Sequence, residues 1–159
     1  MIVRPPRPDE WERWKELRLR ALRDAPLAFL ETIERAESHD DALWRSRVAP
    51  SDARASAVAI TDAGEWVGQM VVLLDAEPPT LVGVYVDPRH RGDGTAQRLL
   101  EALVGRARAT GAATLRLQVS EGNDRARRFY ERMGFVATGD VELIPGHPIP
   151  EHEMLLDLR

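Results

Sequence analysis

The amino-acid sequence predicts a mixed α/β fold (an α+β mixed sheet) built around one dominant sheet, and three observations support this. Short apolar or alternating runs, typical of strands, interleave with segments whose apolar residues recur at helical spacing. The predicted order is β-α-α-β-β-β-α-β-α-β-β, which is typical of mixed layer architectures. The length of 159 residues, with 43% hydrophobic and 30% charged residues, suits one globular core. We therefore expect a single domain over residues 1–159.

The first third of the chain predicts a short strand followed by helices. Ile2–Arg4 is the strand, and Asp9, which follows a proline-rich stretch, is a suitable N-cap for the next helix. Apolar residues then recur at roughly helical spacing, namely Trp11, Trp14, Leu17 and Leu22. Residues 27–48 predict one or two further short helices, and the clearer one covers residues 40–48.

The middle of the chain predicts three strands. The three β-like runs cover residues 55–61, 66–74 and 80–86. Asp62-Ala63-Gly64 separates the first two runs, and this turn composition predicts a hairpin. The third run follows two prolines and leads into a glycine-rich turn.

The last part of the chain predicts two helices and three strands. Apolar residues from Ala96 to Ala107 fall on one helical face, and Gly111 marks the end of that helix. Thr114–Ser120 alternates apolar and polar residues and predicts a strand with one buried face. Asn123 caps a second helix that stops at Gly134. Two closing β runs cover residues 135–141 and 153–158.

Composition excludes several kinds of function. The net charge of −4 lacks the basic footprint of a nucleic-acid-binding protein, so no nucleic-acid partner is expected. The absence of cysteine excludes disulfides, thiolate metal sites and a cysteine nucleophile. His39 and His90 lack metal-ligand spacing, and we expect no metal. Without an apolar signal core or a run of transmembrane length, we expect no membrane association and a cytoplasmic location.

The segment from Val84 to Ala96 is the most informative part of the sequence. It leads from a buried strand through a glycine turn into a helix, so free backbone N–H groups and the positive end of the helix dipole converge there. Gly92 and Gly94 leave the backbone accessible to an anion such as a pyrophosphate, and Arg91 supplies a charge. Two glycines in a tight turn serve equally well as a simple connection.

Two other phosphate-binding motifs do not fit this segment. A P-loop requires Gly-Lys followed by Ser or Thr, which the sequence lacks. A dinucleotide-binding fingerprint requires a small residue where Gln97 stands, although Glu121 lies at a suitable distance downstream.

Two motifs together resemble a known family. The pattern Pro88-x-x-Arg91-Gly92-x-Gly94-x-Ala96-x-x-Leu99 is similar to the acyl-CoA loop of the GNAT superfamily of N-acetyltransferases. The segment from Asn123 to Phe135 resembles that family's Asn-x-x-Ala-x-x-Phe-Tyr-x-x-x-Gly-Phe helix. The resemblance covers about residues 2–158, with only an outline match in the parts expected to face the acceptor.

The resemblance implies a fold, a cofactor and a set of binding residues. The expected GNAT-like fold has a central, mostly antiparallel sheet of about six or seven strands, splayed in the middle and flanked by about four helices. The cofactor is acetyl-CoA, with coenzyme A as the product, and its pantetheine arm pairs with the backbone of Val84 and Val86. The implied cofactor-binding residues are Val84, Tyr85, Val86, Arg91, Gly92, Asp93, Gly94, Thr95, Ala96, Asn123, Ala126 and Tyr130.

Tyr130 occupies the family's position for the general acid that protonates the departing thiolate. Taken alone, a tyrosine at this helical spacing is more often a core aromatic. The attacking amine must also lose a proton, and the family has no fixed base. Glu31 is our candidate, with Glu77 and Asp75 as alternatives, although a carboxylate at each of these positions is more often a solvated surface group. His147 and His152 are further candidates for the acceptor pocket.

The leading functional prediction is an acetyl-CoA-dependent N-acetyltransferase that acts on a small primary amine, an amino-acid derivative or an antibiotic. An acidic group in the helical insert, Glu31, Glu34, Glu37, Asp40 and Asp41, would favour a cationic acceptor if it faced the cleft. The alternatives are acetylation of protein N-termini or lysines, and a non-catalytic acyl-CoA sensor. Transfer of a longer acyl chain and formation of a homodimer are left open.

Overall fold

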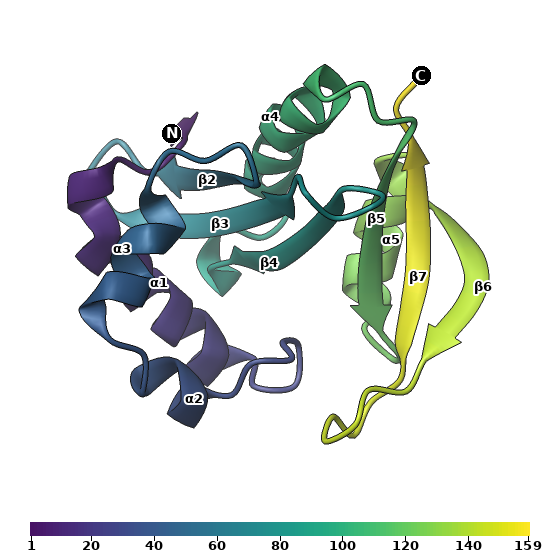
Figure 1. Cartoon of the computed structure of the whole chain (residues 1–159), viewed down its shortest axis with the longest axis horizontal. Helices are drawn as coiled ribbons and strands as arrows, with labels where there is room; N and C mark the ends of the chain where they lie inside the picture. The colour runs from purple at the N-terminus through teal and green to yellow at the C-terminus, as the bar shows by residue number, and fades with distance from the viewer.

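The computed structural model describes all of residues 1–159 and consists of one seven-stranded sheet flanked by helices (Figure 1). The strand order is β1-β2-β3-β4-β5-β7-β6. The strands are β1 (Ile2–Arg4), β2 (Arg54–Ile60), β3 (Trp66–Leu73), β4 (Thr80–Val86), β5 (Thr114–Ser120), β6 (Val136–Glu142) and β7 (Glu151–Asp157). Only β4 and β5 pair in parallel, so the expected mixed, mostly antiparallel sheet is confirmed.

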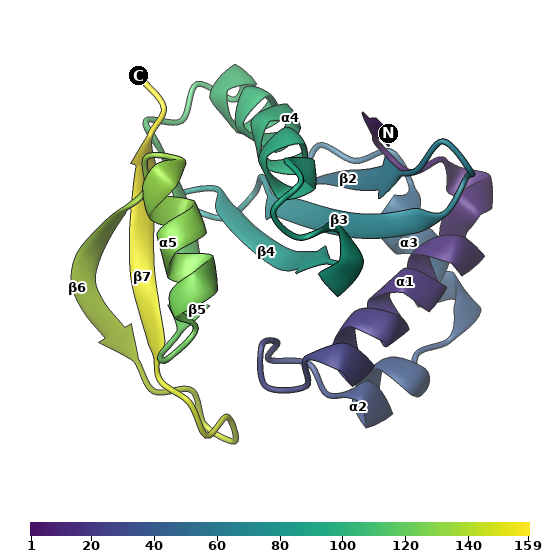
Figure 2. The ribbon, with the colours of Figure 1, turned by 180° about the vertical axis from the view of Figure 1, so that it is seen from behind.

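Helices cover both faces of this sheet. They are α1 (Trp11–Asp24), α2 (Ile33–Glu37), α3 (Asp41–Val48), α4 (Thr95–Ala109) and α5 (Asp124–Arg132), with short 3-10 turns at Pro8–Glu10 and Pro88–His90. One core cluster joins α1 and α3 to the sheet, and a second cluster joins α4 and α5 to the opposite face. Figure 2 shows α4 and α5 on this opposite face.

The sheet is open between β4 and β5. The two strands pair only at Thr80 with Arg116 and at Leu81 with Leu117, and then they diverge (Figure 1). An irregularity in the pairing of β3 with β4 falls at this point, and Gly83 adopts φ +61° there. Glycine suits this position because residues with a Cβ rarely adopt positive φ. The expected splay in the middle of the sheet is therefore confirmed.

Most expected elements lie within two residues of their predicted bounds, and three details differ. Asp9 lies inside a 3-10 turn and does not cap α1, whose N-cap residue is Glu10. The insert forms two helices, so five helices flank the sheet instead of about four. The last strand begins at Glu151, because its pairing with β5 extends to Ser120. No helix of the chain is both long enough and apolar enough to span a bilayer.

Candidate active site

The turn between β4 and α4 presents a set of unpaired backbone amides. Gly92 and Gly94 adopt φ +84° and +91°, and a Cβ built at either position would meet no atom within 4 Å. The N–H groups without a hydrogen-bond partner belong to Gly92, Asp93, Gly94, Ala96 and Gln97. They lie at the N-terminus of α4, where the helix dipole adds positive potential. This arrangement fits an anionic group such as a pyrophosphate.

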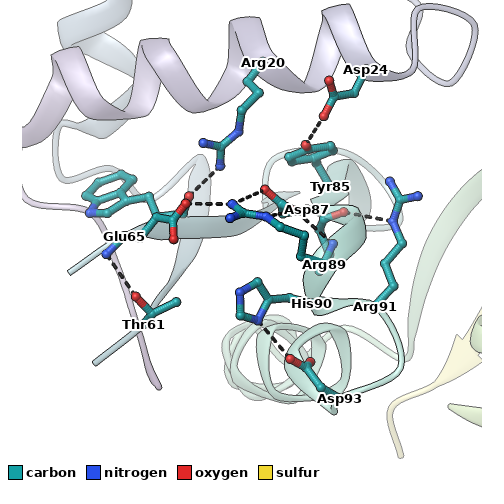
Figure 3. A network of polar contacts seen from close by, with 12 residues as sticks. Arg20, Asp24, Thr61, Glu65, Tyr85, Asp87, Arg89, His90, Arg91 and Asp93 are labelled. Atoms are coloured by element: carbon teal, nitrogen blue, oxygen red, sulfur yellow. Dashed lines mark hydrogen bonds and ion pairs between the residues drawn. The ribbon is translucent and has the colours of Figure 1, made fainter. Parts of the chain in front are cut away.

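Side chains of the same turn hold its shape. Oδ1 of Asp93 accepts hydrogen bonds from the backbone N–H of Thr95 at 3.0 Å and from its hydroxyl at 2.6 Å. These bonds, chiefly the one from the hydroxyl, lower the pKa of the Asp93 carboxyl. His90 Nδ1 lies 3.0 Å from the other carboxylate oxygen (Figure 3). Asp93 and Thr95 thus hold the turn in place and leave the neighbouring amides free.

A second ion-paired group fixes the junction between β4 and the turn. Arg89 donates to Asp87 through its backbone N–H, Nε and Nη2, and Nη2 also lies 2.7 Å from Oε1 of Glu65 (Figure 3). The side-chain hydrogen bond from Arg89 is the main cause that lowers the pKa of Asp87 to about 2. Nε of Arg91 donates to the carbonyl of Val86 at 3.0 Å, so Arg91 lies against the strand.

The edge of β4 that faces β5 carries free backbone groups. The N–H of Asp87 donates to Val67 of β3 at 2.8 Å. Successive residues of a strand direct their N–H groups to opposite edges, so those of Val84 and Val86 face the divergence. Pairing with β5 ends at Leu81, and no strand covers this edge. The side chain of Tyr85 points to the face of the sheet that α1 covers, where its hydroxyl contacts Asp24 (Figure 3).

Tyr130 lies in the core on the α4 and α5 side of the sheet. Its side chain packs between Phe129 and Phe135, with ring centroids 5.5 and 5.8 Å away, and its hydroxyl has no hydrogen-bond partner. Burial raises its pKa, so the phenol keeps its proton at neutral pH. Val84, Ala96 and Ala126 pack against the same core cluster. Asn123 accepts a hydrogen bond from the N–H of Ala126 at 3.3 Å and caps α5.

A cavity of about 360 Å³ opens where β4 and β5 diverge, on the face that α1 covers. Its walls come from α1, from residues 28–31, from the middle of β3 and from residues 80–83 of β4, with Gln118 and Glu151 on the far side. Cavities of roughly 300–1,000 Å³ are usual for small-molecule ligands. The cavity therefore has the place and the size of an acceptor site.

Glu31 lines this cavity and has two arginines and a histidine around its carboxylate. Its carboxylate lies 3.2 Å from Arg18, 3.5 Å from Arg47 and 2.8 Å from His39. Burial opposes its ionisation, but the hydrogen bond from His39 and the two arginine charges outweigh burial and lower the pKa of Glu31. A carboxylate with a lowered pKa is a weaker proton acceptor.

The other expected candidates lie elsewhere. Neither Glu77 nor Asp75 lines the cavity, and Glu77 borders a separate hollow at the closed end of the divergence. His152 lies 3.2 Å from Glu121 near the start of α5. His147 is buried against Glu151, with 3.0 Å between Nε2 and the carboxylate.

Sequence reasoning missed Glu151. Its side chain lines the cavity, is 5% exposed, and accepts a hydrogen bond from the hydroxyl of Ser120 at 2.9 Å. In the sequence it directly follows a proline-rich loop and carries no periodic signal. The cavity arginines, Arg18, Arg47 and Arg54, were missed for a related reason, because they come from three separate elements.

Comparisons with known proteins agree with this geometry. Residues 11–135 match the profile of the Acetyltransferase (GNAT) family. The peptidyl-lysine N-acetyltransferase YjaB of Salmonella typhimurium is 38% identical over 94 residues, which cover 58% of this chain and 59% of that protein. A nourseothricin acetyltransferase structure has 30% identity, a TM-score of 0.63 and 70% coverage of both chains. The PaiA N-acetyltransferase of Thermoplasma acidophilum, solved with coenzyme A, has a TM-score of 0.75 at 19% identity, with 98% of both chains covered. The chain spans only about 39–59% of the length of the curated relatives it matches.

Proposed function

The chain belongs to the GNAT family of acetyltransferases, and on this premise we propose that it transfers the acetyl group of acetyl-CoA to a primary amine of a small molecule. The observation that carries the proposal is a convergence of three features at one place. Free amides at the start of α4, a free strand edge on β4 and a cavity of about 360 Å³ all meet at the divergence of β4 and β5.

The residues present fit acetyl-CoA. The five unpaired amides around Gly92 and Gly94 suit its pyrophosphate, with Arg91 beside them. The backbone of Val84 and Val86 offers hydrogen bonds to an extended amide-bearing arm, in the manner of an added strand. Acetyl-CoA supplies an activated acetyl thioester, and the chain supplies the groups that hold it and move protons.

The N–H of Val84 is the proposed donor to the thioester carbonyl oxygen. It belongs to a strand held by β3, so it needs no rearrangement when negative charge develops on that oxygen. A preorganised backbone donor of this kind lowers a barrier by about 3 kcal/mol.

The proposed proton acceptor is one of the two cavity carboxylates, Glu31 or Glu151. Primary amines are mostly protonated at neutral pH, and one proton must leave before the nitrogen attacks. The hydrogen bond from His39 and the charges of Arg18 and Arg47 favour the charged form of Glu31 and weaken it as a base. The side-chain carboxylate of Glu151 has Ser120 and His147 as its polar partners, on the β5 side of the divergence, and no arginine beside it, so we favour Glu151.

Tyr130 is the proposed general acid that gives its proton to the departing thiolate. A phenol is protonated at neutral pH, and burial raises the pKa of Tyr130 further. The same apolar surroundings raise the pKa of a thiol leaving group, which makes its thiolate a stronger acceptor for that proton.

The competing functions are protein acetylation and a sensor without turnover. One relative is named for peptidyl-lysine and one similar structure for nourseothricin, so the comparisons contain both kinds of acceptor. We favour a small molecule, because the cavity of about 360 Å³, with residues 28–31 as one wall, has room for a whole small ligand. A protein acceptor would place a single lysine side chain in it.

The test is a thiol-release assay with purified protein, acetyl-CoA and a panel of small amines and peptides, run beside Tyr130→Phe. Turnover on small amines, lost mainly in kcat with Tyr130→Phe, supports the proposal. Turnover restricted to peptides or proteins supports protein acetylation. Tight acetyl-CoA binding with no thiol release from any acceptor supports the sensor.

A further inference from the structure

The acceptor cavity contains an arginine without a partner. Arg54 lies at the start of β2 and reaches the cavity, where its guanidinium forms no hydrogen bond or ion pair, and Nε is fully buried. Such buried, unpaired groups are rare in native proteins and need an explanation. Arg54 and Arg47 also border a neighbouring hollow beside α3, so both arginines lie between that hollow and the cavity.

Further polar atoms on this side of the molecule are also unpaired. Nη1 of Arg18 has no partner, although Nε and Nη2 of the same side chain bind Glu31. Oε1 of Gln69 is buried without a partner and comes from a side chain that lines the cavity. The cavity therefore offers free guanidinium donors together with one free carbonyl acceptor.

The cavity contains no carboxylate that pairs with Arg54. The charged residues are Arg18, Arg47, Arg54, Glu31 and Glu151. Glu31 is already paired with two of the arginines, and Glu151 binds Ser120 and His147. The whole chain carries a net charge of −4, so the positive end of the cavity does not follow from overall composition.

The pKa of Arg54 is consistent with a missing anion. Burial lowers it to about 10, and the like charges of Arg47 and Arg18 contribute. An anion beside the guanidinium would offset all of these causes.

We propose that the acceptor amine carries an anionic oxyacid group, such as a carboxylate, which binds Arg54 and the free Nη1 of Arg18. This inference rests on the proposed N-acetyltransferase function and names its substrate class. A planar guanidinium with two free edges binds a carboxylate or a phosphonate through paired, charge-assisted hydrogen bonds. The free carbonyl of Gln69 accepts a hydrogen bond from a donor on the same molecule.

The register of the sheet sets the distance between the two ends of this acceptor. Arg54 pairs with Leu73 and Leu73 with Thr80, while the reacting position is at Val84. The backbone of Arg54 therefore lies roughly 13 Å from that of Val84 along the strand direction and about 10 Å across two strands. The side chain of Arg54 spans part of this distance. The acid group therefore lies several bonds away from the amine, as in an ω-amino acid.

The experiment compares matched acceptors in the thiol-release assay. Each set shares one chain length and ends in a primary amine at one side and a carboxylate, a carboxamide or a second amine at the other. We expect kcat/KM for the carboxylate to exceed that for the carboxamide by about 10-fold to 100-fold, with the diamine poorest. A phosphonate series tests whether the preference extends to other oxyacids, and α-amino acids test the spacing.

Variants connect the preference to Arg54. Arg54→Gln should reduce the carboxylate preference to about threefold or less, and Arg54→Lys, which keeps the charge but not the fork, should lie between. Arg132→Gln is the matched control, because Arg132 is exposed at the end of α5 and has no partner. It should leave the preference unchanged.

The outcomes separate this inference from the proposed function. If the wild type acetylates amines but favours diamines or carboxamides, the enzyme stands and the acid-binding site is wrong. If no amine reacts, thermal unfolding with coenzyme A and ω-amino acids decides the matter. If ω-amino acids raise Tm and Arg54→Gln abolishes this rise, the acid-binding site is supported without the enzyme activity. If no ω-amino acid raises Tm, with or without coenzyme A, the acid-binding site is overturned.

Discussion

The hydroxyl of Tyr85 donates a hydrogen bond of 2.5 Å to Oδ2 of Asp24, which ties the end of β4 to the last residue of α1 (Figure 3). The loop that follows α1 supplies residues 28–31, which form one wall of the cavity. A contact outside the cavity thus holds the start of the segment that lines it.

Tyr85→Phe should loosen this wall of the cavity without removing any of the proposed reacting groups. Asp24 is exposed, so we expect the free energy of unfolding to fall by only about 1 kcal/mol. The KM for the acceptor should rise more than kcat falls, because the loop at Ala28 and Phe29 is less well held. Denaturant unfolding and steady-state kinetics measure both effects. A fall in kcat with an unchanged KM would contradict this role.

Stability at high pH should depend on Tyr85. Burial and the hydrogen bond to Asp24 raise the pKa of Tyr85 to about 12. A raised phenol pKa stabilises the fold fully below the unfolded value of about 10, and this contribution is lost as the pH rises through 12. The chain has two tyrosines, and the pKa of Tyr130 is also raised. Spectroscopic titration of the folded protein should show no phenolate near pH 10, and Tyr85→Phe should leave one late transition. A tyrosine that ionises at its ordinary pKa would refute the buried placement.

Tyr130→Phe separates the acid from the core aromatic. The hydroxyl has no partner, so its removal should change the free energy of unfolding by less than about 0.5 kcal/mol. If Tyr130 protonates the leaving thiolate, kcat falls by about 100-fold to 10,000-fold while acetyl-CoA affinity is nearly unchanged. Calorimetric titration of acetyl-CoA is the control. An unchanged kcat would leave Tyr130 with a packing role only.

Two glycines of α4 provide a matched pair of substitutions. Gly94 adopts φ +91° at the N-cap, so Gly94→Ala should cost about 1–2 kcal/mol of stability and place a methyl group among the free amides. Acetyl-CoA should then bind about tenfold more weakly or worse. Gly105 lies inside the helix with open space around it, and Gly105→Ala should stabilise the protein by about 1 kcal/mol with unchanged binding. Equal effects on affinity from the two variants would argue against a pyrophosphate site at the turn.

The two cavity carboxylates should respond differently to substitution. The lowered pKa of Glu31 means that its stabilising contribution is present above its unfolded value of about 4.5 and is lost as the pH falls through the lower folded value. Glu31→Gln should therefore lower stability at neutral pH, by about 1–3 kcal/mol, and flatten its acid dependence.

Glu151→Gln should instead reduce kcat at neutral pH while acetyl-CoA affinity stays nearly unchanged. Steady-state kinetics of both variants distinguish the two roles. If Glu31→Gln lowers kcat and Glu151→Gln does not, Glu31 is the base.

The sequence predicted most of the fold, and it also indicated candidate donor-site residues, because both kinds of signal are local. The alternation in β5, the cap at Asn123 and the glycines at 92 and 94 each act within a few residues, and the structure places them on the expected elements. The cavity depends instead on tertiary register. Arg18, Arg54 and Glu151 line it together only because α1, β2 and β7 occupy their particular places around the divergence, and none of them belongs to a local pattern. The acidic insert suggested a cationic acceptor, yet Glu31 is neutralised by arginines inside the cavity.

The two residue pairs between β4 and β5 also make the sheet mechanically uneven. Strands β1 to β4 form one continuous ladder and strands β5 to β7 form another, and the strand pairing that joins them is limited to the segment from Pro79 to Leu81. The free protein is in this sense two lobes on a short hinge, held otherwise by the shared apolar cluster on the α4 side. A pantetheine arm bound between β4 and β5 would contact both lobes and restrict their relative motion. Binding of the cofactor would therefore make the whole molecule more rigid.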